Sequence, residues 1–128
     1  MDIKRSGSQP SGKGPAEYFT GNVRIDPLFE APDPARVRSA AVTFEPGART
    51  AWHSHDKGQL LLVEAGRLRT QKKGQAIKDL GVGESDYTAP NLVHWHGAVP
   101  GQSVVQINVG FGGETKWLEP VTDAEYRK

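Results

Sequence analysis

Short runs of apolar residues, separated by turn residues, follow one another along the chain from Asn22 onward. "VRSAAVTF" (37–44) is followed by a Pro46-Gly47 turn, and "QLLLVEA" (59–65) ends at Gly66. Runs of this length bounded by Gly and Pro are typical of β-strands. The second run is apolar almost throughout, which predicts a strand buried on both faces.

The same pattern continues to the end of the chain. Further candidate strands are RTAWHSH (49–55), RLRTQ (67–71), QAIKDL (75–80), ESDYTA (84–89), LVHWHGA (92–98) and SVVQINVGF (103–111). About eight or nine strands at roughly ten-residue spacing predict an all-β protein, an antiparallel sandwich or barrel. One short helical turn is predicted at the C-terminus, where Thr122 and Glu125 form a T-x-x-E capping box. Residues 1–20, rich in Ser, Gly, Lys and Pro over 5–16, are predicted to form an extended arm.

Composition narrows the class of protein. The 128 residues can form one domain, 1–128, with a real core. The formal net charge of +1 gives no sign of a nucleic-acid or membrane-surface partner, so a small molecule is the expected ligand. The chain has no cysteine, which excludes disulfides and thiolate metal sites. With no apolar leader and no stretch of membrane-spanning length, the cytoplasm is the expected location.

All four histidines lie in two H-x-H pairs, His53 with His55 and His94 with His96. Residues i and i+2 of a strand point to the same face, so inside a barrel the two pairs converge on one cavity. Gln59 opens the following strand across a three-residue turn and can reach the same place. Neutral imidazoles and an amide oxygen suit a divalent metal ion. A lone H-x-H is more often a surface pair or a hydrogen-bonded core pair, but two pairs holding every histidine favour a metal site.

The spacing around these residues resembles the two cupin motifs. "GARTAWHSHDKGQLLLVEAG" (47–66) is similar to G-x5-H-x-H-x3-E-x6-G, except that a glutamine replaces the glutamate. "GESDYTAPNLVHWHGA" (83–98) is similar to G-x5-P-x-G-x2-H-x3-N, with Ala89, Asn91 and Ala98 as departures. The departure at Asn91 is mild, because Asn tolerates left-handed backbone. The resemblance implies a jelly-roll barrel with motifs over 47–98. It also implies four metal ligands: His53, His55, Gln59 and His94.

A closer resemblance covers nearly the whole chain, including "GKGPAEYFTGNVRIDPLF" near the start and "WLEPVTDAEYRK" at the end. The chain is similar to bacterial cupins that include manganese-dependent hydroxynitrile lyases, which share the ligand set of three histidines and one glutamine. This implies Mn²⁺, with iron, nickel and zinc as alternatives, and a carbon–carbon lyase acting on a small hydroxy or carbonyl compound such as a cyanohydrin. There are two alternatives. One is another metal-dependent cupin enzyme, such as a dioxygenase or an isomerase, and the other is a non-catalytic cupin that binds a small ligand.

Gln59 and His96 affect which reaction the site can catalyse. A Gln59 ligand leaves both charges of a divalent ion uncancelled, which favours polarisation of an alcohol or carbonyl oxygen. His96 remains as a general base, a further metal contact, a residue that supports the ligands or a packed core residue. The lyase members carry one more pocket histidine on the penultimate strand, where this chain has Gln106 and Asn108. These amides can orient a substrate but cannot transfer protons near neutral pH, so the predicted catalytic pair is His96 and Gln106.

Two tryptophans adjoin the histidines. Trp52 and Trp95 have the opposite parity and are predicted to lie on the outer face of the barrel. Burial beneath the N-terminal arm would account for them. A homo-oligomer interface, in a dimer or tetramer, accounts for them slightly better, since a small barrel rarely leaves two tryptophans bare.

Overall fold

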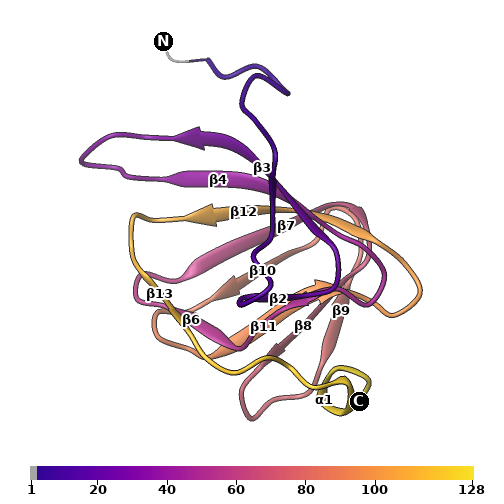
Figure 1. The fold of residues 1–128 in the computed structure, drawn as a ribbon. Helices are drawn as coiled ribbons and strands as arrows, with labels where there is room; N and C mark the ends of the chain where they lie inside the picture. The colour runs from indigo at the N-terminus through magenta and orange to yellow at the C-terminus, as the bar shows by residue number, and fades with distance from the viewer. Residues whose placement is uncertain (1–2) are drawn as a thin grey trace.

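The chain folds into two curled antiparallel β-sheets that face each other, as the computed structural model of residues 3–128 shows (Figure 1). The first sheet has the order β1 (Gly12–Lys13), β3 (Val23–Glu30), β4 (Arg38–Phe44), β12 (Val104–Gly110), β7 (Gln59–Gly66) and β10 (Ser85–Thr88). The second has the order β13 (Thr115–Trp117), β6 (His53–His55), β11 (His94–Ala98), β5 (Arg49–Thr50) and β2 (Phe19–Thr20), while β8 (Leu68–Lys72) joins β11 to β9 (Lys78–Leu80). This is the predicted jelly-roll barrel.

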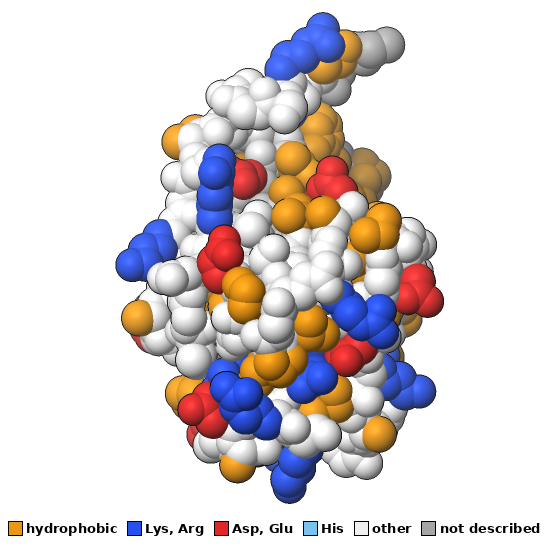
Figure 2. All heavy atoms as spheres, turned by 90° about the vertical axis from the view of Figure 1, so that its right-hand side faces the viewer, with side chains coloured by type: hydrophobic (Ala, Val, Ile, Leu, Met, Phe, Trp, Pro, Cys, Tyr) orange, Lys and Arg blue, Asp and Glu red, His pale blue; other side chains and the backbone are white. Residues whose placement is uncertain are grey.

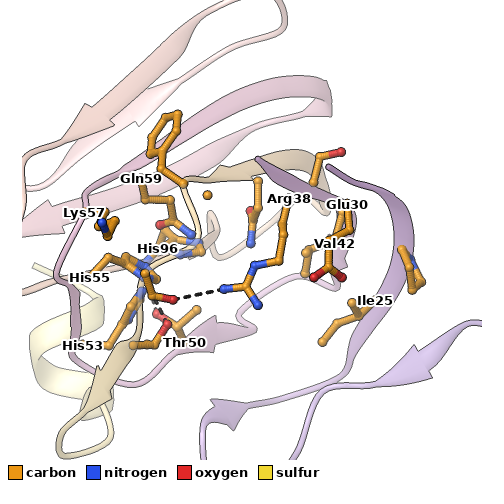
Figure 3. A pocket seen from close by; sticks show the side chains of 18 of the residues that line it. Ile25, Glu30, Arg38, Val42, Thr50, His53, His55, Lys57, Gln59 and His96 are labelled. Carbon is orange, nitrogen blue, oxygen red and sulfur yellow. Dashed lines mark hydrogen bonds between the residues drawn. The ribbon is translucent and has the colours of Figure 1, made fainter. Parts of the chain in front are cut away.

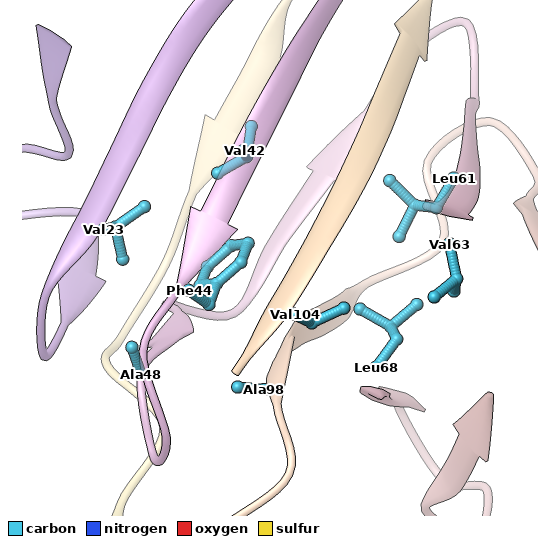
Figure 4. Packing of buried hydrophobic residues seen from close by; sticks show 9 residues of the cluster. All are labelled: Val23, Val42, Phe44, Ala48, Leu61, Val63, Leu68, Ala98 and Val104. Carbon is cyan, nitrogen blue, oxygen red and sulfur yellow. The ribbon is translucent and has the colours of Figure 1, made fainter. Parts of the chain in front are cut away.

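The inner faces of the sheets form the core at one end of the barrel (Figure 4). Alternate residues of β12 point inward, so Val104 and Gln106 are fully buried. The buried cluster consists of Val23, Val42, Phe44, Ala48, Leu61, Val63, Leu68, Ala98 and Val104. Gly97 of β11 allows the close approach of β5, because a Cβ there would overlap the backbone of Ala48 and Arg49. The other end of the barrel is left open for a pocket.

Strand β7 is buried on one face only, so the prediction of burial on both faces is wrong. Leu61 and Val63 point into the core, whereas Leu62 is 39% exposed. The jelly roll presents the outer face of this sheet to solvent, and no helix covers it among residues 3–128. The long apolar run therefore reflects half-exposed leucines on the outer face as well as buried ones on the inner face.

From residue 12 onward, the N-terminal arm is built into both sheets instead of lying free. Gly12 and Lys13 pair with β3, and Phe19 and Thr20 pair with β5. Strand β3 itself was not predicted, because Pro27 interrupts its pattern and the register shifts between Pro27 and Phe29. The short strand β13 was missed too, since three residues carry no clear alternation.

The C-terminal segment ends in the predicted helical turn, α1 (Asp123–Tyr126). Its capping box is formed, with the Glu125 amide donating to Thr122 Oγ1 at 3.1 Å and the Thr122 amide donating to Glu125 Oε1 at 2.9 Å. Tyr126 and Val121 pack against Trp52 and Trp95 and bury them. The chain's own C-terminus thus covers both tryptophans, so neither the N-terminal arm nor a partner subunit is needed to do so. The homo-oligomer itself stays a prediction.

The surface shows no strongly charged region on the face seen in Figure 2, where basic and acidic side chains are interspersed. The N-terminal segment projects from the body at the top of that view. No helix within residues 3–128 is both long enough and apolar enough to cross a membrane.

Candidate metal centre

His53 and His94 form the centre of a histidine cluster. They lie directly opposite each other in the antiparallel pair of β6 and β11, and their ring centroids are 4.3 Å apart. Opposed residues of an antiparallel pair point to the same face of the sheet. The pairing of these two short strands therefore brings together imidazoles 41 positions apart in sequence.

The other two histidines join them from the same strands, as the i, i+2 spacing predicts. The His55 ring lies 4.9 Å from that of His53 and 5.5 Å from that of His94. The His96 ring lies 5.3 Å from that of His53 and 5.8 Å from that of His94. All four imidazoles thus share one site.

Two tight loops complete the cluster. Gly58 has φ of 78° in the turn between β6 and β7, and this turn places Gln59 Oε1 3.3 Å from His94 Nε2. Asn91 has φ of 65°, a left-handed conformation that Asn adopts more readily than most residues, and its amide donates to the carbonyl of His55 at 2.8 Å. Asn91 therefore fills the glycine position of the second motif without loss of the loop's conformation.

The hydrogen bonds of the rings leave nitrogen lone pairs directed at one another. Nδ1 of His53 donates to the carbonyl of Ala51 at 2.8 Å, and Nδ1 of His94 donates to that of Leu92 at 3.1 Å. Each Nε2 consequently carries a lone pair, and that of His94 faces an amide oxygen, which is also an acceptor. His55 Nε2 is buried and has no hydrogen-bond partner among residues 3–128. Hydrogen-bond acceptors that face one another without a donor between them suit the binding of a cation.

Burial keeps the cluster uncharged. It lowers the pKa values of His53 and His96 well below their ordinary range, and the neighbouring imidazoles lower them further. It also lowers the pKa of His94 to about 4, and it lowers the pKa of His55. At neutral pH all four rings are neutral, the state in which an imidazole binds a metal.

The donor atoms of His53, His94 and His96 all lie within 4.8 Å of one another, a spacing that suits a metal ion. This trio differs from the ligand set implied by the motifs, because it includes His96 and leaves out His55. Gln59 and His55 nevertheless border the same space. Two ligand sets with His53 and His94 in common are thus compatible with the geometry.

His96 is fully buried and is held by a chain of amides. Its Nδ1 donates to Gln106 Oε1 at 3.0 Å, while Gln106 Nε2 donates to Asn108 Oδ1. The bond to an amide oxygen fixes the proton on Nδ1 and leaves the lone pair on Nε2. Gln106 and Asn108 thus orient a neutral imidazole whose free nitrogen can accept a proton or bind an ion.

A pocket of about 380 Å³ opens onto the cluster (Figure 3). His53, His55, Gln59 and His96 line it, whereas the fully buried His94 does not. Its apolar walls are formed by Phe19, Ile25, Pro27, Phe29, Val42, Phe44, Phe111 and Trp117. A small molecule in this pocket would contact the histidines on one side and aromatic rings on the others.

Many pocket residues were not found from the sequence, among them Arg38, Lys57 and Trp117. Arg38 lies an even number of positions from Val42 and Phe44, so all three share one face of the strand. The sequence does not say which face of that strand points inward. Trp117 lies on the unpredicted strand β13, and its ring centroid is 4.8 Å from that of His53. Lys57 follows His55 in a turn, where a lysine carries no signal of its own.

Comparisons with known proteins agree with this geometry. Residues 40–109 match the family model described as the cupin domain. The chain is 52% identical to the (R)-mandelonitrile lyase of Granulicella tundricola over 131 residues, covering 100% of both chains. A cupin-like protein from Thermotoga maritima superimposes with a TM-score of 0.85 at 39% identity, over 99% of this chain and 96% of that one. A cupin-2 domain protein from Rhodospirillum rubrum shares the fold alone, with a TM-score of 0.75 at 14% identity, over 97% and 82% of the two chains.

Proposed function

Because the chain belongs to the cupin family, we propose that it is a metal-dependent hydroxynitrile lyase that cleaves a cyanohydrin into a carbonyl compound and cyanide. The observation that carries the proposal is the set of neutral, inward-facing imidazoles at the floor of an aromatic pocket. The relative that is 52% identical over its full length bears the name of this activity.

We propose His53, His55, Gln59 and His94 as the residues that hold the ion, and Mn²⁺ as the first candidate for that ion. The unpartnered Nε2 of His55 and the opposed acceptors of His94 and Gln59 support this set. A bound divalent ion would act as a Lewis acid on the hydroxyl or carbonyl oxygen of the substrate. Since Gln59 is an uncharged donor, it would leave the full charge of the ion available for this purpose.

His96 is proposed to accept the hydroxyl proton of the cyanohydrin at Nε2. The bond from Nδ1 to Gln106 Oε1 supports this role, because it stabilises the tautomer with a free lone pair on Nε2 and would also stabilise the imidazolium formed. Loss of that proton lets the C–O bond become a carbonyl while the C–C bond to the nitrile carbon breaks and the electron pair leaves with cyanide. Gln106 acts here as a positioning residue for His96.

The donor set disfavours the dioxygenase alternative. A mechanism in which a ligand carboxylate takes the substrate proton needs a glutamate where this chain has Gln59. Within residues 3–128, the only carboxylate lining the pocket is Glu30, which lies on the far side of Arg38 from the histidines (Figure 3). Within residues 3–128, no carboxylate therefore lines the pocket beside the cluster, where such a base would contact a bound substrate.

Release of benzaldehyde from mandelonitrile tests the proposal. The Mn²⁺-loaded protein is expected to release benzaldehyde faster than the same protein stripped with chelator, and readdition of Mn²⁺ is expected to restore the rate. The double substitution of His53→Ala and His94→Ala serves as the matched control, because it removes two of the proposed ligands and leaves the apolar and aromatic side chains of the pocket in place. Equal rates with and without metal, or an active double variant, would refute metal-dependent lysis. Oxygen uptake with small phenolic compounds would favour the dioxygenase instead.

A further inference from the structure

Arg38 lines the pocket with a solvent-accessible guanidinium group that forms no ion pair within residues 3–128. Its side chain extends from the first residue of β4 toward the histidines, as Figure 3 shows. Within residues 3–128, its side chain forms one hydrogen bond, from Nη2 to the carbonyl oxygen of Gly113 at 3.1 Å. Four other arginines of the chain, in contrast, are paired with aspartates: Arg24, Arg36, Arg49 and Arg69.

The acid opposite Arg38 in the sheet does not form an ion pair with it. Glu30 is its register partner on β3, yet the two side chains form no ion pair within residues 3–128. Figure 3 shows the guanidinium between the histidines and Glu30, so Glu30 leaves the side toward the histidines free. Lys57 is the other cation lining the pocket, which makes the pocket net positive. An anionic group bound between Arg38 and the histidines would balance this positive charge.

The remaining walls define the rest of such a ligand. Phe29, Phe111 and Trp117 line the same pocket and suit a flat apolar or aromatic body. A guanidinium fork pairs best with a planar carboxylate, through two parallel hydrogen bonds. From this arrangement we infer that the substrate is a hydroxy or carbonyl compound that carries a carboxylate, with Arg38 binding the carboxylate and the histidine cluster facing the reacting oxygen. This inference rests on the proposed function for the reacting end of the molecule.

A pair of non-reactive probes that differ only in charge tests the inference. Para-hydroxymethylbenzoate carries the carboxylate, and para-hydroxymethylbenzamide is its neutral isostere. Titration calorimetry of the Mn²⁺-loaded protein is expected to show the acid binding about tenfold more tightly than the amide, or better, as hydrogen bonds to charged groups allow. In Arg38→Gln the two probes are expected to bind within about twofold of each other, because a neutral side chain cannot pair with the carboxylate.

Two further variants make the assignment specific. Arg38→Lys keeps the charge and is expected to retain part of the preference, while Lys57→Gln, which removes the other pocket cation, is expected to keep most of it. Because Arg38 is exposed at the start of a strand, Arg38→Gln is expected to melt at the wild-type temperature. Equal binding of the two probes by the wild type would overturn the inference. So would an unchanged preference in Arg38→Gln, which would place the carboxylate on the metal.

The outcome is separable from that of the lyase assay. If mandelonitrile is not cleaved but the acid still depends on Arg38 for binding, the lyase proposal fails and the carboxylate site stands. If mandelonitrile is cleaved and the probes bind equally, the lyase stands and the carboxylate site fails. Where both hold, Arg38→Gln is expected to lower the ratio of kcat/KM for the cyanohydrin of para-formylbenzoate to kcat/KM for mandelonitrile about tenfold.

Discussion

His55 and His96 lie on opposite sides of the central pair of imidazoles, His53 and His94. Their hydrogen bonds differ, and the difference suits a ligand role for His55 and a base role for His96. His55 has a buried Nε2 with no hydrogen-bond partner within residues 3–128, which suits a metal ligand. His96 is held through Nδ1 by Gln106, a polar support suited to a base. The distances alone group His96 with His53 and His94, so the assignment needs a direct test.

We expect His55→Ala to weaken Mn²⁺ binding by at least about a hundredfold, because loss of a ligand costs more than loss of a residue that only supports one. His96→Ala, the matched substitution on the other strand, is expected to keep nearly full metal content while mandelonitrile cleavage is lost. Elemental analysis after dialysis against buffered Mn²⁺, together with the benzaldehyde assay, measures both. Metal retained by His55→Ala and lost by His96→Ala would assign the site to the trio of His53, His94 and His96.

Much of this site was predictable because strand parity is a local rule. The i, i+2 spacing places His53 with His55 and His94 with His96 on shared faces, and the structure shows those faces meeting. The position of Arg38 was not predictable, because its contribution depends on which face of β4 points inward and on how far the strand extends over the pocket. Both are properties of the whole barrel.

At the scale of elements, strands with clear turns around them were predicted and irregular ones were not. The runs at 37–44, 59–65 and 103–111 correspond closely to β4, β7 and β12. Strand β3 escaped because Pro27 and the register shift hide its pattern, although its pairing with β4 runs from Val23 to Glu30. The cover of the tryptophans was misjudged for a related reason: a four-residue helix gives little sign in sequence of what it packs against.

Arg49 fastens the C-terminal segment to the barrel. It is 4% exposed, and its Nη2 donates to the carbonyl of Val121 at 2.7 Å and to Asp123 at 2.8 Å. The guanidinium carbon also lies 4.6 Å from the centre of the Tyr126 ring, which packs against Trp95. One buried side chain thus supports the segment that covers both tryptophans.

We expect Arg49→Met to lower the free energy of unfolding by about 3 kcal/mol, since it removes charge-assisted hydrogen bonds and a cation–π contact from a buried position. Asp123→Asn is expected to cost less, because the Asp123 side chain is 78% exposed and solvent screens its charge. Urea unfolding followed by tryptophan fluorescence measures both, with the exposed Arg67→Met as control. Equal losses in Arg49→Met and Arg67→Met would show that the segment is not fastened in this way.

For the whole molecule, four neutral histidines in one site link folding to pH. Between about pH 4 and 6.5 the unfolded chain protonates His94, whose pKa in the folded protein is lowered from 6.5 to about 4 by burial, whereas the folded chain does not. The unfolded state then binds more protons, so the stability of the metal-free protein falls as the pH falls through this window. The shift corresponds to about 3 kcal/mol for His94 alone, at 1.36 kcal/mol per pH unit. The pKa values of His53, His55 and His96 are lowered as well, so they act in the same direction.

Unfolding free energies of the chelator-treated protein at pH 7 and pH 4.5 measure this dependence. The wild type is expected to lose stability between the two, and His94→Gln is expected to lose less, because its side chain does not titrate. Comparing the change with pH within each protein removes the cost of the substitution itself from the result. With Mn²⁺ present, binding to the folded state alone is expected to add stability at both pH values, because the Nε2 atoms of the folded protein stay largely unprotonated down to about pH 4. A metal-free protein whose stability is the same at both pH values would show that the imidazoles do not titrate on unfolding and that burial does not keep them neutral.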